Sequence, residues 1–178
     1  TPVPLRGGEV LDSPVGPLQV LATPGHSPDH VSFLAAEAGI LFCGDTLLAH
    51  VTPTPILFLD PDDGFRRMPS LLLHLRSLEA LAGLQVRRAC PGHGPEIHDV
   101  AAHVARDLDF VQARQGTFLA AARRGADTPW ALAREVFGDQ DPTGHILAIS
   151  ETVAYLDLLE RDAGLEVRWE GDLIRVRP

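Results

Sequence analysis

Three short motifs each place a histidine or an aspartate directly after a strand-like apolar run. They are TPGHSPDH at residues 23–30, FCGD at residues 42–45 and PGHGP at residues 91–95. The proline and glycine residues in these motifs favour tight turns, so the polar side chains are expected at the edge of a sheet. We therefore predict that a rigid sheet brings His26, Asp45 and His93 together.

These three side chains have the chemistry of metal ligands. Imidazole nitrogen and carboxylate oxygen bind zinc, and mixed nitrogen and oxygen donors also suit manganese or iron. His26 and Asp45 are 19 residues apart, and Asp45 and His93 are 48 apart, so no single helix face can gather them. A carboxylate can bridge two cations, which a histidine cannot. The motifs predict a metal site, or half of one.

Composition places the chain among globular proteins. Its 178 residues are 45% hydrophobic and 22% charged, and no apolar run approaches the roughly 18 residues of a membrane span. No targeting signal is visible, so a cytoplasmic location without membrane association is expected. The net charge of −9 lacks the basic footprint of phosphate-backbone binding, which argues against DNA as a partner.

The first half of the chain alternates strands with one helix. Strands are predicted at residues 18–22, 30–36, 39–43 and 85–90, the middle two forming a hairpin that ends at Asp45. Leucines at helical spacing predict a helix over residues 65–82, with Pro69 in its first turn or kinking it. This order is typical of an α/β or α+β fold.

The second half is predicted to be three helices closed by a hairpin. The helices cover residues 99–124, 128–137 and 145–163, and the hairpin covers residues 165–176. Asp127 or Thr128 is predicted to cap the second helix, with Pro129 at its favoured first position. This is the order of a winged-helix domain. We place the domain boundary near residues 96–99, which gives domains at 1–96 and 97–178.

The segments TPGHSPDHVSF, LFCGDTLL and CPGHGP resemble the later metal-binding motifs of the metallo-β-lactamase superfamily, in the same order. The trailing helices and hairpin resemble the winged-helix appendage of the branch with glyoxalase II-like hydrolases and lactamase-like endoribonucleases. The resemblance implies the second half of an αββα sandwich followed by a winged-helix-like domain. It also implies that His26 binds one metal, that Asp45 bridges both metals as the catalytic carboxylate, and that His93 binds the second.

The chain departs from the superfamily pattern in one respect. The HxHxDH motif, which supplies the other ligands, does not occur in it. Each metal would therefore have two protein ligands here, against the three that are usual in catalytic zinc sites. We expect weak metal binding and no turnover by the chain alone. The apolar face of its sheet should be covered by a missing N-terminal half or by a second copy of the chain.

In the complete domain, the resemblance implies metal-assisted hydrolysis by a hydroxide held between two cations, with zinc expected and manganese or iron as alternatives. The substrate would be a small ester or thioester, or the phosphodiester of single-stranded RNA. The alternative is a non-catalytic binding or regulatory module, in which a winged helix rests on a degraded half-domain.

The remaining polar and thiol residues are interpreted from their local context. His30 is predicted either to support a metal ligand or contact the substrate, or to make a structural hydrogen bond. The aspartates of residues 59–64 are interpreted as turn formers, and Arg66 and Arg67 as a solvated face. Cys43 and Cys90 are predicted to be buried reduced thiols. Surface or loop positions are expected for the other histidines: His50, His74, His98, His103 and His145.

Overall fold

The computed structural model describes residues 2–53, 56–60 and 66–178 of the chain. The chain divides into two compact units, one of Thr1–Pro53 with Leu73–Leu108 and the other of Thr54–Leu72 with Asp109–Pro178. This division differs from the sequence-based boundary near residues 96–99, because a long helix, α2 (Val100–Arg123), runs on past Leu108.

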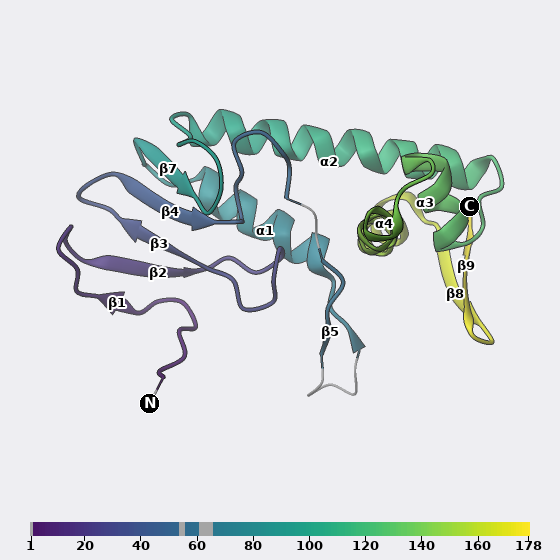
Figure 1. The fold of residues 1–178 in the computed structure, drawn as a ribbon, viewed down its shortest axis with the longest axis horizontal. Helices are drawn as coiled ribbons and strands as arrows, with labels where there is room; N and C mark the ends of the chain where they lie inside the picture. Colours follow the sequence, from purple (N-terminus) through teal and green to yellow (C-terminus); the bar gives the residue numbers. More distant parts are fainter. Residues whose placement is uncertain (1, 54–55, 61–65) are drawn as a thin grey trace. The chain divides into compact units, whose positions relative to one another are not determined.

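The first unit is built on a five-stranded sheet (Figure 1). Its strands lie in the order β1-β2-β3-β4-β7, and all neighbours are antiparallel except β4 and β7. Their bounds are β1 Val10–Leu11, β2 Leu18–Ala22, β3 Val31–Ala35, β4 Ile40–Gly44 and β7 Arg88–Pro91. It follows that β2, β4 and β7 run in the same direction and end at the same edge of the sheet.

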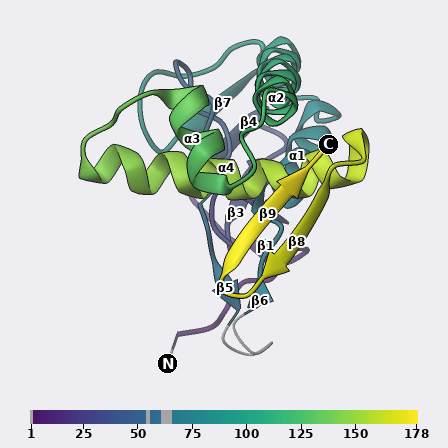
Figure 2. The same ribbon diagram turned by 90° about the vertical axis from the view of Figure 1, so that its right-hand side faces the viewer.

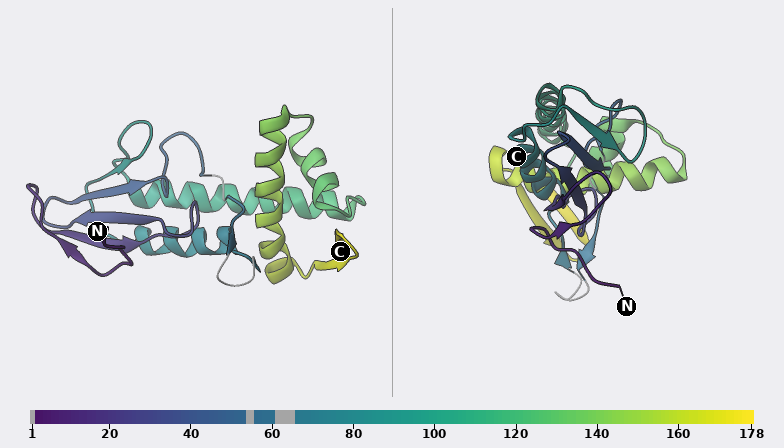
Figure 3. Two further views of the ribbon diagram at one scale, coloured as in Figure 1. Left: turned by 60° about the horizontal axis from the view of Figure 1, so that its bottom comes forward. Right: turned by 90° about the vertical axis from the view of Figure 1, so that its left-hand side faces the viewer.

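One face of this sheet packs on helices. Leu34, Leu41 and Cys43 form a buried cluster with residues of α1 (Ser70–Ala82) and of the first turns of α2, among them Leu78 and Val104. Figure 3 shows α1 running alongside the strands. The opposite face carries Val20 and Ala35, which are buried, and five hydrophobic residues that are only partly buried: Leu18, Val31, Phe33, Ile40 and Phe42.

Helix α1 begins later than the leucine spacing predicted. Arg66–Arg67 form a short strand, β6, paired with β5 (Leu59–Asp60). Pro69 has no N–H and biases the preceding residue toward extended backbone, so the helix starts only at Ser70. The prediction of a helix from residue 65 was therefore wrong at its start. Residues 61–65, including most of the aspartate-rich turn, lie outside the described residues.

The second unit contains the predicted series of helices and the closing hairpin (Figure 2). After α2 come α3 (Pro129–Phe137), α4 (Pro142–Ala163), β8 (Glu166–Glu170) and β9 (Leu173–Arg177). Phe118 lies at its core, with ring centroids 5.0 Å from Tyr155 and 5.9 Å from Phe137. The mixed α/β architecture matches the predicted fold class.

Side-chain caps fix where two of these helices begin. The hydroxyl of Thr128 accepts a hydrogen bond from the Ala131 N–H at 3.1 Å, as expected for an N-cap ahead of Pro129. Asp141 caps α4 in the same way, so this helix begins at Pro142 instead of the predicted His145. No helix within the described residues is long and apolar enough to cross a membrane.

Candidate metal centre

The structure brings His26, Asp45 and His93 together at one edge of the sheet. Asp45 Oδ2 lies 3.7 Å from His26 Nε2 and 3.5 Å from His93 Nε2. The three residues follow β2, β4 and β7, the strands whose ends share this edge. A single carboxylate oxygen therefore faces two imidazole nitrogens that are remote in the sequence.

Two glycines allow the loops to approach this closely. A Cβ on Gly25 would lie 2.4 Å from the Cα of His74, so the His26 loop rests directly on the backbone of α1. Gly25 also has a φ of +143°, which side chains rarely adopt. A Cβ on Gly92 would lie 2.7 Å from Asp45 Oδ1. The positions of His26 and His93 thus depend on glycine next to each histidine.

The polar atoms of the site fit metal coordination in part. Among the residues that the structure describes, His26 Nδ1 and Asp45 Oδ1 are buried and have no hydrogen-bond partner, and leaving a buried polar atom unpaired costs free energy. Across residues 2–53, 56–60 and 66–178, no three His, Cys, Asp or Glu side chains are arranged to hold one ion together. The donors come instead as two pairs that share Asp45. This arrangement suits half of a two-metal site.

The site is open to solvent on the His93 side. The side chain of His93 is 78% exposed, whereas those of His26 and Asp45 are 25% and 27% exposed. His93 therefore makes few contacts that would fix its rotamer. A ligand that completes the site has direct access to this imidazole.

His30 contacts the backbone that carries Asp45. Its Nε2 accepts a hydrogen bond from the Asp45 N–H at 3.2 Å, so in the neutral ring the hydrogen is on Nδ1. Nδ1 lies 2.8 Å from the Thr23 hydroxyl and 3.0 Å from the Thr46 hydroxyl. Burial, with a smaller effect of the nearby His26, lowers the pKa of His30 and favours this neutral form. His30 acts on the site by positioning the Asp45 loop.

Two histidines that were expected at the surface are buried. His74 is 1% exposed and His103 is 4% exposed, so the surface prediction was wrong for both. A signal was present in the sequence, because His74 continues the leucine stripe of Leu71 and Leu78 at helical spacing.

The other local assignments agree with the structure in most cases. His50 and His98 are exposed, as expected. Cys43 is buried as predicted, whereas Cys90 is only partly buried, and both are free thiols. Cys90 differs because it lies in β7, at the edge of the sheet.

Comparison with known proteins identifies the family. The sequence model of the metallo-beta-lactamase superfamily matches residues 1–93. The chain belongs to this superfamily. Its relatives include proteins named as a metallo-hydrolase and a thioesterase, which supports hydrolase chemistry at the level of the superfamily.

Two curated superfamily relatives illustrate the likeness. A probable metallo-hydrolase of Bacillus subtilis (strain 168) is 29% identical over 170 residues, covering 96% of this chain and 53% of the relative. An atrochrysone carboxyl ACP thioesterase of Aspergillus fumigatus is 29% identical over 143 residues, covering 74% of this chain and 41% of the relative. The chain therefore spans about half the length of the curated relatives that it matches.

Two solved superfamily structures share the fold over nearly the whole chain. A metallo-beta-lactamase family protein from Thermus thermophilus matches with a TM-score of 0.83 and 33% identity, over 99% of this chain and 54% of that protein. A beta-lactamase domain protein from Burkholderia ambifaria matches with a TM-score of 0.83 and 24% identity, over 97% and 51% of the two chains. The second likeness concerns the fold alone.

Proposed function

We propose that this chain supplies His26, Asp45 and His93 to the two-metal centre of a hydrolase that acts on a thioester or ester. The observation that carries the proposal is the position of Asp45 Oδ2 between the Nε2 atoms of His26 and His93. Each imidazole would bind one ion, and the carboxylate would be shared. Zinc suits this donor set, and manganese or iron also fit it.

The metals would activate water and polarise the substrate's carbonyl oxygen. The chain itself positions the proposed metal ligands. His30, in its neutral form, holds the Asp45 backbone N–H, and the tight contacts at Gly25 and Gly92 fix the two histidine loops. The carboxylate and the His26 imidazole are thus placed before any ligand binds, which reduces the cost of assembling the centre.

A thioester is the favoured substrate for two reasons. A relative from Aspergillus fumigatus bears the name of an ACP thioesterase. The net charge of −9 also disfavours a polyanion such as single-stranded RNA. We further propose that α2, α3, α4 and the β8–β9 hairpin form a winged-helix-like module.

We propose that a second polypeptide segment completes the centre. The chain has no HxHxDH motif, and its relatives are about twice as long. The partly buried apolar face of the sheet, with Phe33 and Phe42 paired on it, offers the surface on which such a segment would pack. An N-terminal half or a second copy would bury this face.

Zinc titration calorimetry tests the ligand assignment. The chain should bind zinc weakly, Asp45→Asn should abolish this binding, and His50→Gln should leave it unchanged because His50 lies outside the centre. Tight binding at two sites by the wild-type chain alone would contradict the half-site. Equal binding by Asp45→Asn would reject the assignment of Asp45.

Activity assays test the reaction. A longer protein that includes an HxHxDH segment should hydrolyse acyl thioesters, whereas the 178-residue chain should not. Cleavage of single-stranded RNA in place of thioesters would overturn the substrate class. No hydrolysis of either by the longer, metal-loaded protein would favour the regulatory alternative.

A further inference from the structure

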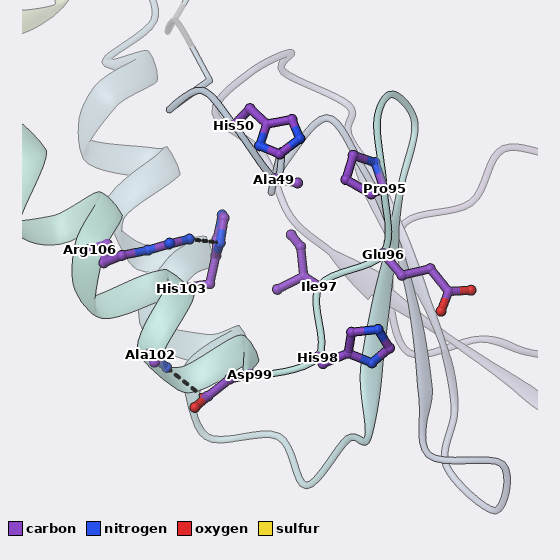
Figure 4. Close-up of a pocket in the computed structure, with 10 residues that line it drawn as sticks. All are labelled: Ala49, His50, Pro95, Glu96, Ile97, His98, Asp99, Ala102, His103 and Arg106. Carbon is purple, nitrogen blue, oxygen red and sulfur yellow. Dashed lines mark hydrogen bonds between the residues drawn. The ribbon is translucent and has the colours of Figure 1, made fainter.

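A pocket in the first unit lies outside the candidate metal centre. It has a volume of about 390 Å³ and is formed by the loop at Ala49 and His50, the segment from Pro95 to Asp99, and the start of α2 (Figure 4). Its walls follow closely after Asp45 and His93 in the sequence, yet neither of these residues lines it. The volume falls in the usual range for small-molecule sites.

One fixed cation, Arg106, lines this pocket. Three histidines, His50, His98 and His103, line it as well, together with the carboxylates of Glu96 and Asp99. Glu96 pairs with Arg88 at 3.0 Å. Asp99 accepts a hydrogen bond from the Ala102 N–H at 3.0 Å, as Figure 4 shows. Arg88 offsets the charge of Glu96, and Asp99 caps α2, so Arg106 is the permanently charged group in the lining that can attract an anion.

His103 and Asp107 form a buried polar pair next to Arg106. Arg106 Nη2 donates to His103 Nδ1, so the hydrogen of the neutral ring is on Nε2, which faces Asp107 Oδ2 at 3.6 Å. Thr52 donates to the other oxygen of Asp107 at 3.1 Å. Asp107 is 5% exposed, and burial raises the pKa of its carboxyl, an effect that His103 opposes. His103 is therefore buried, with Arg106 bonded to its Nδ1 at the wall of the pocket.

The pocket also has an apolar wall. Ile97 is 6% exposed, and Ala49, Pro95 and Ala102 lie around it. In Figure 4, Ile97 is turned toward His103, whereas Glu96 and His98 point the other way. Inside the pocket, one guanidinium and two imidazoles therefore face an aliphatic surface.

We propose that this pocket binds a small organic carboxylate. Arg106 would hold the carboxylate, because a planar guanidinium matches two oxygens in one plane. His50 would approach it from the opposite wall, and the apolar body of the ligand would lie against Ile97. One guanidinium matches a single negative charge, which favours a monocarboxylate over a phosphate dianion. The proposal does not depend on the metal chemistry.

Binding of benzoate to the full chain tests the proposal. Calorimetric titration and the imidazole proton resonances should show saturable binding, with shifts at His50 and His103. Arg106→Gln should weaken binding by about tenfold or more, because a hydrogen bond to a charged group is lost. Arg123→Gln is the matched control, since Arg123 is exposed on the same helix but does not line the pocket.

Further measurements separate the effect of the ligand's charge from that of its shape. Benzamide, which has the same ring without the charge, should bind much more weakly than benzoate, and inorganic phosphate should not displace benzoate. His103→Gln should also weaken binding, because it removes the group that positions Arg106. Benzoate binding that is unchanged in Arg106→Gln, matched by benzamide or absent from the wild-type chain would overturn the proposal. Tighter binding of phosphate would overturn the carboxylate assignment.

Discussion

His30 carries the same side chain as His26 and His93, but its surroundings give it a different task. Its Nε2 accepts from the Asp45 backbone, and its Nδ1 is enclosed by two threonine hydroxyls. The sequence could place His30 near the site, since it shares a motif with His26. It could not show which ring atoms face which partners, because this depends on loops that only the folded sheet brings together.

Replacing His30 should therefore destabilise the fold as well as the centre. His30→Ala leaves the Asp45 N–H without its acceptor, which should lower the free energy of unfolding by about 1–3 kcal/mol. Urea denaturation measures this change. His50→Ala removes an exposed loop imidazole and should cost less than about 0.5 kcal/mol. Equal effects of the two substitutions would contradict the positioning role.

The thiol of Cys43 should be unreactive in the folded protein. Burial raises the pKa of Cys43 to about 12, so almost none of it is thiolate at pH 8. In a Cys90→Ser variant, which leaves Cys43 as the only thiol, a disulfide reagent should react only after denaturant is added. Rapid labelling of this variant under native conditions would be inconsistent with a buried Cys43.

Among the elements, those with a strong local pattern were predicted best. The strand at Leu18–Ala22 and the helix capped by Thr128 agree with the structure because alternation and capping are local properties. The two-residue strands β5 and β6 were missed, since they have no periodicity of their own. The burial of His74 could have been predicted only by counting this polar residue as part of the apolar stripe of the helix.

The contact between the His26 loop and α1 predicts a large effect of a small substitution. Gly25→Ala would place a methyl group 2.4 Å from the Cα of His74 at a φ of +143°. Strain and overpacking together should cost about 2–5 kcal/mol in thermal or urea unfolding. Gly94→Ala is the control, because Gly94 has a positive φ but open space around it, and it should cost about 1–2 kcal/mol.

The burial of His74 makes the stability of the fold depend on pH. Burial lowers the pKa of His74 from 6.5 to about 4, so below pH 6.5 the unfolded chain binds a proton that the folded chain does not. Stability should fall as the pH drops from 6.5 toward 4, by up to about 1.4 kcal/mol per unit. His74→Leu should reduce this slope, and neither ring nitrogen of His74 loses a hydrogen bond to any described residue in the exchange. An unchanged slope in urea titrations across this pH range would count against this role of His74.

On the scale of the whole molecule, the convergence of the three proposed ligands follows from strand direction. Because β2, β4 and β7 are parallel to one another, the loops after them meet at one edge. Motifs after strand-like runs were therefore enough to predict that His26, Asp45 and His93 come together. The Arg106 pocket was not predicted, because its residues belong to a loop, a bridge and a helix with no shared motif.

The second face of the sheet determines how the chain should behave in solution. Phe33 and Phe42 are directly paired on it and only partly buried, and burying such rings in a partner stabilises association. We expect sedimentation of the chain to depend on concentration, and Phe33→Ser with Phe42→Ser to shift it toward the monomer. Leu173→Ser, at an exposed position of the β8–β9 hairpin, should leave association unchanged. A wild-type chain that stays monomeric at all concentrations, without an added segment, would show that this face needs no partner. The proposal that a second segment packs on this face and completes the metal centre would then also fail.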